Sequence, residues 1–158
     1  MPFGTRRPLT AGEIKALTPG LAKALRAAGS EPQILARPAL GARFARLWRR
    51  STPIIAWKDR IYWPGALTDF AAQPRLVALL QHELQHVLEY RTGELGPVRY
   101  ALSPHNWRYA YQPTAKARWL AFGAEQRAQI VEDLWLIERG LKVGAAPLEW
   151  YRRIVPWA

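Results

Sequence analysis

Two histidines and a glutamate in the stretch "LLQHELQHVLEY", residues 79–90, have the spacing of a metal site. His82 and His86 are four residues apart, and Glu83 directly follows the first histidine. Residues four apart share one face of a helix, so the two imidazoles can converge on one ion. Glu83 lies beside that face, where its carboxylate reaches a water on the ion instead of the ion itself. The spacing predicts a zinc-binding helix with Glu83 as general base.

An ordinary amphipathic helix that contains histidine is the alternative. The chain has only three histidines, and two of them fall in this one pattern. Chance is therefore a weak explanation, although the same pattern also occurs on helices that hold no metal. A core or surface histidine pair stays open as the second interpretation.

Zinc needs a third protein ligand, and the sequence excludes two kinds. The chain has no cysteine, so no thiolate can bind the ion. A pattern with Gly and a third His three and six residues after the second His fails, because Glu89 and Thr92 stand there. His105 is the remaining histidine, but it follows Pro104 in an expected loop, where an exposed or hydrogen-bonded role fits equally well.

A glutamate from a second, downstream helix is the remaining kind of ligand, and Glu125 is the predicted one. It stands in the first turn of a helix, within "AEQRAQ", whose small alanines permit a close approach to the motif helix. Gln129, one turn later, can accept a hydrogen bond from a ligating imidazole. Glu132 is the reserve ligand. The alternatives are a favourable helix-dipole position for Glu125 and a solvated acidic face for Glu132.

Two further roles are expected from aromatic segments. Tyr109 or Tyr111 can donate a phenolic hydrogen bond to an oxyanion, with packing under a loop as the alternative. The strand around 61–63 precedes the motif helix, as does the edge strand on which zinc peptidases of this type lay extended substrates. Packing inside the core is the alternative for that strand.

The candidate site residues are expected to be positioned by several helices and one small β element. Thr10 and Glu13 form a capping box that starts a helix at Ala11, and Pro19–Gly20 ends it. The other helices are expected at 21–29, 39–50, 74–93 and 124–140. Two runs rich in β-branched and aromatic residues, 54–57 and 61–63, flank a tight turn and predict a hairpin. Residues 93–123 are loop-like.

The predicted fold class is α+β, mostly helical, in a single domain over 1–158. A chain of 158 residues with 49% hydrophobic residues can bury one core without disulfides. Within it we expect a basic helical part at 1–50 and a catalytic core at 51–140. No secretory signal and no apolar run of about 18 residues is visible, so we expect a cytoplasmic product without a membrane span, with export by a dedicated secretion apparatus as the alternative.

The formal charge of +11 has two interpretations. Basic residues concentrate in "TRRPL", "LAKALRAAG" and "ARFARLWRR", which can attract nucleic acid, anionic lipid or an acidic partner. A solvated basic surface is favoured, because no nucleic-acid motif with a defined docking element accompanies the charge.

Five segments in order carry a resemblance to a family. They are "RRPLTAGEI", "IYWPG", "LLQHELQHVLEYRTG", the Tyr-x-Tyr of "WRYAY", and "EQRAQIVED". Together they resemble small bacterial Vgr-related proteins, which are similar to a predicted zinc-metallopeptidase domain found near contractile injection and type VI secretion clusters. The match covers most of the chain and is least characteristic over 15–52. One departure is Leu88–Glu89, where members often have Trp-Gln or Gln-Gln, a difference that bears on substrate preference.

The resemblance implies a zincin-like fold of gluzincin type. It implies His82 and His86 as zinc ligands, Glu83 as the catalytic glutamate and Glu125 as the downstream glutamate. The expected substrate is a peptide or protein, with components of a contractile injection or type VI secretion system as partners. The alternative is a non-enzymatic basic adaptor, chaperone or nucleic-acid-associated protein in which the metal site is structural or vestigial.

Overall fold

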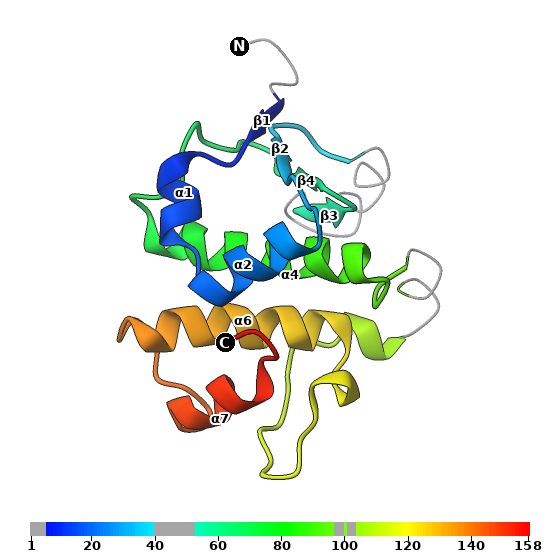
Figure 1. Cartoon of the computed structure of the whole chain (residues 1–158), viewed down its shortest axis with the longest axis vertical. Helices are drawn as coiled ribbons and strands as arrows, with labels where there is room; N and C mark the ends of the chain where they lie inside the picture. Colours follow the sequence, from blue (N-terminus) through cyan, green and yellow to red (C-terminus); the bar gives the residue numbers. More distant parts are fainter. Residues whose placement is uncertain (1–5, 40–52, 97–99, 101–103) are drawn as a thin grey trace.

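Two long helices lie side by side at the centre of the molecule. The computed structural model describes residues 6–39, 53–96, 100 and 104–158. The helices are α4 (Pro74–Thr92) and α6 (Ala124–Glu138). The sheet and the first two helices lie on the α4 side, and the C-terminal helix lies on the α6 side (Figure 1). The motif helix is therefore packed on both sides.

A four-stranded mixed sheet covers part of α4. Its order is β1-β2-β4-β3, with β2 and β4 parallel and the two outer pairs antiparallel. The strands are β1 (Arg6–Pro8), β2 (Gln33–Leu35), β3 (Ile55–Trp57) and β4 (Arg60–Tyr62). The predicted hairpin is confirmed as β3 and β4, whose turn begins at Lys58 with φ 53°.

The expectation that the strand around 61–63 is the edge strand is wrong. β4 is paired on both sides, and Ile61 is fully buried between its neighbours. A strand with partners on both sides has no backbone groups left for a substrate. In the described part of the chain the edge strand next to the motif helix is β3, which packs against α4.

The N-terminal part is not only helical, since it supplies β1 and β2. Helix α1 (Ala11–Ala16) begins where the capping box predicts: Thr10 Oγ1 accepts from the Glu13 amide at 3.0 Å, and Glu13 Oε2 accepts from the Thr10 amide at 2.8 Å. Helix α2 (Pro19–Ala27) begins at the proline that was expected to end α1, because proline suits the first turn of a helix. The helix expected at 39–50 lies almost wholly outside the described residues.

The two long helices agree with their predicted limits. Pro74 is in the first turn of α4, and Gly93 ends the helix with a left-handed φ of 78°. Helix α6 ends two residues before Gly140. Its predicted interior residues are all buried: Ala128, Val131, Leu134 and Trp135.

A short C-terminal helix was not predicted. Helix α7 (Leu148–Ile154) packs against α6 and buries Trp150, Tyr151 and Ile154. Between α4 and α6 the structure describes two short 3-10 turns, η1 (Pro104–Trp107) and η2 (Trp119–Ala121), and a helical conformation at Tyr100, so the described part of this segment is not wholly a loop. The mostly helical α+β class is confirmed. Among the described helices, none has the length and apolar character needed to cross a membrane.

Candidate metal site

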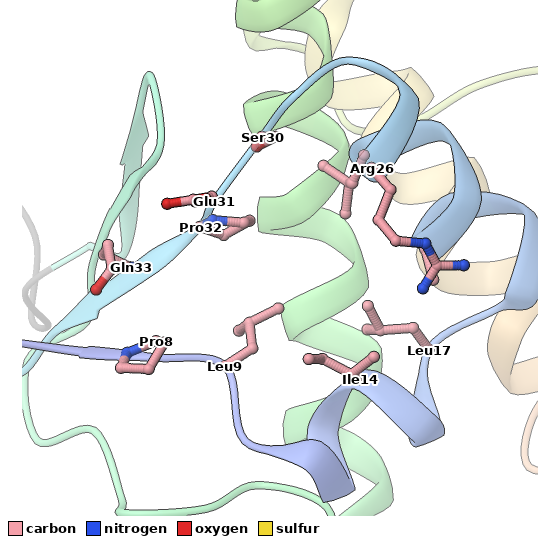
Figure 2. A pocket seen from close by; sticks show the side chains of 11 residues that line it. Pro8, Leu9, Ile14, Leu17, Arg26, Ser30, Glu31, Pro32 and Gln33 are labelled. Carbon is pink, nitrogen blue, oxygen red and sulfur yellow. The ribbon is translucent and has the colours of Figure 1, made fainter.

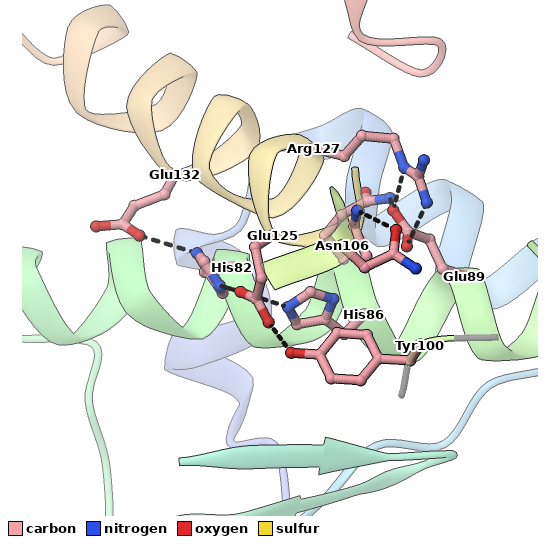
Figure 3. A network of polar contacts seen from close by, with 10 residues as sticks. His82, His86, Glu89, Tyr100, Asn106, Glu125, Arg127 and Glu132 are labelled. Atoms are coloured by element: carbon pink, nitrogen blue, oxygen red, sulfur yellow. Dashed lines mark hydrogen bonds and ion pairs between the residues drawn. The ribbon is translucent and has the colours of Figure 1, made fainter. Parts of the chain in front are cut away.

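Helices α4 and α6 bring His82, His86 and Glu125 together. Glu125 Oε2 lies 3.1 Å from Nε2 of His82 and 3.3 Å from Nε2 of His86. All three side chains are buried, and one ligand atom of each lies within 4.8 Å of the others. Figure 3 shows the Glu125 carboxylate directed at both imidazoles. The predicted ligand residues therefore converge on one point.

The start of α6 is held in place by η1. The side chain of Asn106 accepts a hydrogen bond from the Ala124 amide at 3.2 Å, so it caps the helix one residue before Glu125. Gly123 lies so close to the His105 carbonyl that a Cβ there would overlap with it. A side chain at 123 would push η1 and α6 apart and displace the Glu125 carboxylate.

The second nitrogen of His82 has its own carboxylate. Nδ1 lies 3.2 Å from Glu132 Oε2, and Glu132 is two helical turns from Glu125 on the same face. Glu132, the reserve ligand, thus takes the orienting role expected of Gln129. The Gln129 amide instead donates to Asp133 at 2.9 Å. A carboxylate on Nδ1 fixes the tautomer of an imidazole and leaves the Nε2 lone pair for an ion.

Tyr100 is a member of the site that the sequence did not reveal. Its hydroxyl donates to Glu125 Oε1 at 2.5 Å, while Oε2 faces the histidines. Burial and the Glu125 carboxylate raise the pKa of Tyr100, so the phenol keeps its proton and acts as a donor. No periodicity marks residues 93–123, and three tyrosines lie within twelve positions there, so spacing alone could not select this one.

The facing atoms of His82, His86 and Glu125 are stable together only with a positive charge between them. With a proton on Nδ1 of His82, the Nε2 lone pair faces the Glu125 oxygen, and two electron-rich atoms repel each other at this distance. Burial disfavours a charged imidazole, but Glu125 and Glu132 outweigh it and raise the pKa of His82 to about 10. Burial likewise opposes ionisation of Glu125, yet His82 and His86 hold its pKa well below the usual range. A proton or a metal cation satisfies this arrangement.

The donor set fits zinc. Two imidazole nitrogens and one carboxylate oxygen form the ligand set of one class of catalytic zinc sites, whereas structural sites use four protein ligands. Nδ1 of His86 is buried and has no hydrogen-bond partner among the described residues. His82, His86 and Glu125 therefore supply three metal-ligand atoms of the types that zinc prefers. No other group of this kind is present among the described residues.

A cavity of about 580 Å³ opens onto the three ligands. Glu83 also lines it, is 6% exposed, and makes no hydrogen bond with another residue that the structure describes. Burial raises the pKa of Glu83, although both imidazoles oppose the rise. Its carboxylate is thus beside the cluster, in the same cavity, and its affinity for a proton is increased. These are the properties of a general base.

The two predicted tyrosines lie in different places. Tyr109 lines the cavity and its ring stacks on His82, with centroids 6.0 Å apart. Tyr111 is partly buried and packs against the core, where its hydroxyl donates to Asp133 at 2.6 Å and contacts the Tyr151 hydroxyl at 2.9 Å. The packing alternative therefore describes Tyr111, and Tyr109 keeps its expected position at the site.

The other side chains considered as ligands are bound elsewhere. Nε2 of His105 lies 3.2 Å from the Ala121 carbonyl on the exposed side of η1. Glu138, at the far end of α6, accepts from Arg152. Neither residue belongs to the cluster.

A buried ion pair joins α4 to α6 one turn beyond His86. Glu89 is 1% exposed, and its two oxygens accept from Nε and Nη2 of Arg127 at 2.8 and 2.9 Å. Gln85 donates to the same carboxylate at 2.9 Å, and Nη1 of Arg127 donates to the Phe122 carbonyl. Figure 3 shows this pair beside the metal cluster. It holds the two helices in register, since either charge left alone would be costly.

A second cavity, of about 290 Å³, lies between α1, α2 and β2 (Figure 2). Apolar side chains such as Leu9, Ile14 and Leu17 form much of its wall, and Arg26 and Glu31 are its only charged lining residues in the described chain. The two cavities share no lining residue. The predicted ligands and the predicted base line only the larger of these two cavities.

The contact between His82 and Glu132 leads to a first prediction. Glu132→Ala removes the acceptor on Nδ1, so the ring loses its fixed tautomer and orientation, and zinc affinity should fall by about 10–100-fold. Competition with a chromophoric chelator measures the affinity. Glu138→Ala is the matched control, because it removes a glutamate of the same helix that does not contact the cluster. Equal affinities in the two variants would show that Glu132 does not support the site.

Comparison of the chain with protein-family models, with curated proteins and with solved structures gave no match. The chemistry of this site therefore follows from the side chains that α4 and α6 bring together.

Proposed function

We propose that the protein is a zinc-dependent peptidase of gluzincin type, with a zincin-like fold. His82, His86 and Glu125 hold the ion, and Glu83 is the general base. The observation that carries the proposal is the convergence of these three donors, within 4.8 Å, in a cavity that Glu83 also lines. The sequence resemblance to a predicted metallopeptidase domain supports the same assignment, and it makes components of a secretion system candidate partners.

Zinc, when bound, supplies Lewis-acid chemistry: it polarises a carbonyl and lowers the pKa of water toward about 7. The chain supplies the proton transfers. Glu83 takes a proton from the water that attacks the peptide carbonyl and delivers it to the leaving nitrogen. Its raised pKa suits both steps, because a carboxylate that binds a proton more tightly is a stronger base.

Tyr109 is the proposed donor to the developing oxyanion. Its ring is half exposed in the cavity and stacks on the ligand His82. Tyr100 has a different role, since its hydroxyl is committed to Glu125 and orients that ligand. Hydrogen-bond donors that are already oriented stabilise a transition state at little cost in reorganisation.

The edge strand β3 is the proposed substrate platform. All three of its residues line the cavity, and no described strand pairs with its outer edge. An extended peptide can add to such an edge by main-chain hydrogen bonds, which places one of its carbonyls near the metal ligands.

Metal removal tests the proposal. We expect about one zinc ion per chain by mass spectrometry of the purified protein, and hydrolysis of an unfolded protein substrate that a chelator stops and added zinc restores. Hydrolysis that persists without metal would contradict the mechanism. Absence of bound metal together with salt-sensitive binding to nucleic acid would favour the basic-adaptor alternative.

A further inference from the structure

Three large aromatic side chains are exposed at the cavity that holds the metal cluster. Trp57, Trp107 and Tyr109 are 42%, 54% and 49% exposed, and all three line this cavity. They come from β3, from η1 and from the segment after η1, so the chain brings them together from separate places. Exposed aromatic groups that gather at one cleft are typical of surfaces that bind apolar partners.

The three rings are held in position. Trp57 packs on Tyr90 with ring centroids 5.9 Å apart, and Nε1 of Trp107 donates to the Tyr100 carbonyl at 3.1 Å. Tyr109 stacks on His82. A rigid aromatic group loses little conformational entropy on binding, so each ring can contribute its full contact area to a ligand.

The rings lie on both sides of the ligand cluster. Trp57 belongs to β3, which packs against α4, and Trp107 belongs to η1, which packs against α6. In Figure 1, β3 lies beside α4, and the chain around residue 105 lies at the start of α6. Apolar residues Pro53, Ile54 and Leu95 complete the walls. A peptide that crosses the cleft over Glu83 would contact apolar surface before and after the bond that is cut.

The acidic side chains that line the cleft already have proposed roles as the base and as a metal ligand. Of the described residues that line it, only Glu83 and Glu125 are acidic, and none is Lys or Arg, although the chain has a net charge of +11. The described lining therefore offers no Lys or Arg side chain to the carboxylate at the end of a substrate. It also offers no acidic group for a terminal amine beyond the base and the ligand.

We propose that the cleft cuts within extended polypeptide segments that have large apolar side chains on both sides of the scissile bond. This inference rests on the proposed peptidase function for the cutting step, but the aromatic walls define the binding preference by themselves. The substrate class is unfolded or extended polypeptide, because such segments are buried in folded proteins. Trp57 and Trp107 are the specificity-determining residues.

Paired peptides test the preference. Two peptides with blocked termini differ only next to the scissile bond, with Phe and Leu in one and Ser and Gly in the other. We expect kcat/KM of the wild type to favour the apolar peptide by about 10-fold or more, since apolar contacts of one residue are worth that much. Trp57→Ala and Trp107→Ala should lower the ratio of kcat/KM between the apolar and the polar peptide. Trp57→Phe, which keeps an aromatic ring, should largely keep the ratio of the wild type. Val143→Ala, at a 93% exposed apolar residue outside the cavity, should leave the ratio unchanged.

A binding measurement separates this inference from the proposed function. Zinc-loaded Glu83→Gln protein is titrated with both peptides by calorimetry. No turnover by the wild type combined with tighter binding of the apolar peptide would contradict the peptidase function and support the cleft assignment. Equal binding and equal turnover of the two peptides would overturn the inference, as would faster cleavage of peptides with free termini than of blocked ones.

Discussion

His86→Ala is expected to purify without zinc. The imidazole is one of three protein donors, and the two that remain cannot hold the ion against exchange with water. The loss should exceed the roughly 100-fold that the removal of an outer hydrogen-bond partner costs. Zinc per chain, measured by mass spectrometry after desalting, gives the result. His82→Ala should behave in the same way, and Glu125→Ala should weaken binding strongly.

His105→Ala is the matched control for the ligand variants. It removes the third histidine of the chain, which contacts the Ala121 carbonyl outside the cluster, and should leave the zinc content unchanged. Circular dichroism of each variant shows whether the fold is kept. Full zinc occupancy in His86→Ala would exclude this cluster as the metal site.

The part of the site that lies on one helix could be predicted from the sequence. His82, Glu83 and His86 are fixed relative to one another by helical geometry alone, once Pro74 and Gly93 define the helix. Glu125 followed from the absence of cysteine and of a third histidine in the motif, together with a second predicted helix. The structure brings these four residues to one cavity.

The contacts that depend on how α4 and α6 pack could not be predicted from the sequence. Glu132, rather than Gln129, meets Nδ1 of His82, because the crossing of the helices decides which residue of α6 faces the ring. Tyr100 reaches Glu125 from a segment without periodicity. Strands β1 and β2 have three residues each, too few for an alternating pattern to stand out.

Leu88 and Glu89, where the chain differs from the family that it resembles, belong to packing and not to the cavity at the metal cluster. Leu88 is in the core, and Glu89 is buried against Arg127 rather than lining the cavity. In a sequence, an acidic residue one turn after a ligand resembles a part of the site. Its partner is 38 positions away on another helix, so only the fold shows that its charge is neutralised.

Glu83→Gln is expected to separate chemistry from metal binding. Glu83 is not one of the three ligands, so the amide, which has nearly the same size, should leave zinc content and folding almost unchanged. The amide cannot take a proton from water at neutral pH. Peptide hydrolysis should therefore fall by at least the ~10²-fold typical of losing a general base, with the loss in kcat rather than in KM.

The test compares the zinc content and the turnover of the wild type with those of Glu83→Gln, in one buffer and with a chelator control. It shows whether Glu83 acts in proton transfer or in metal binding. Glu138→Gln makes the same chemical change at a glutamate that contacts Arg152 and should keep full activity. Lost zinc in Glu83→Gln would mean that Glu83 supports the metal instead of the proton transfer. Equal turnover by Glu83→Gln and wild type would remove the base from the mechanism, and with it the peptidase assignment, because no other described acidic residue that lines the cavity is free of a ligand role.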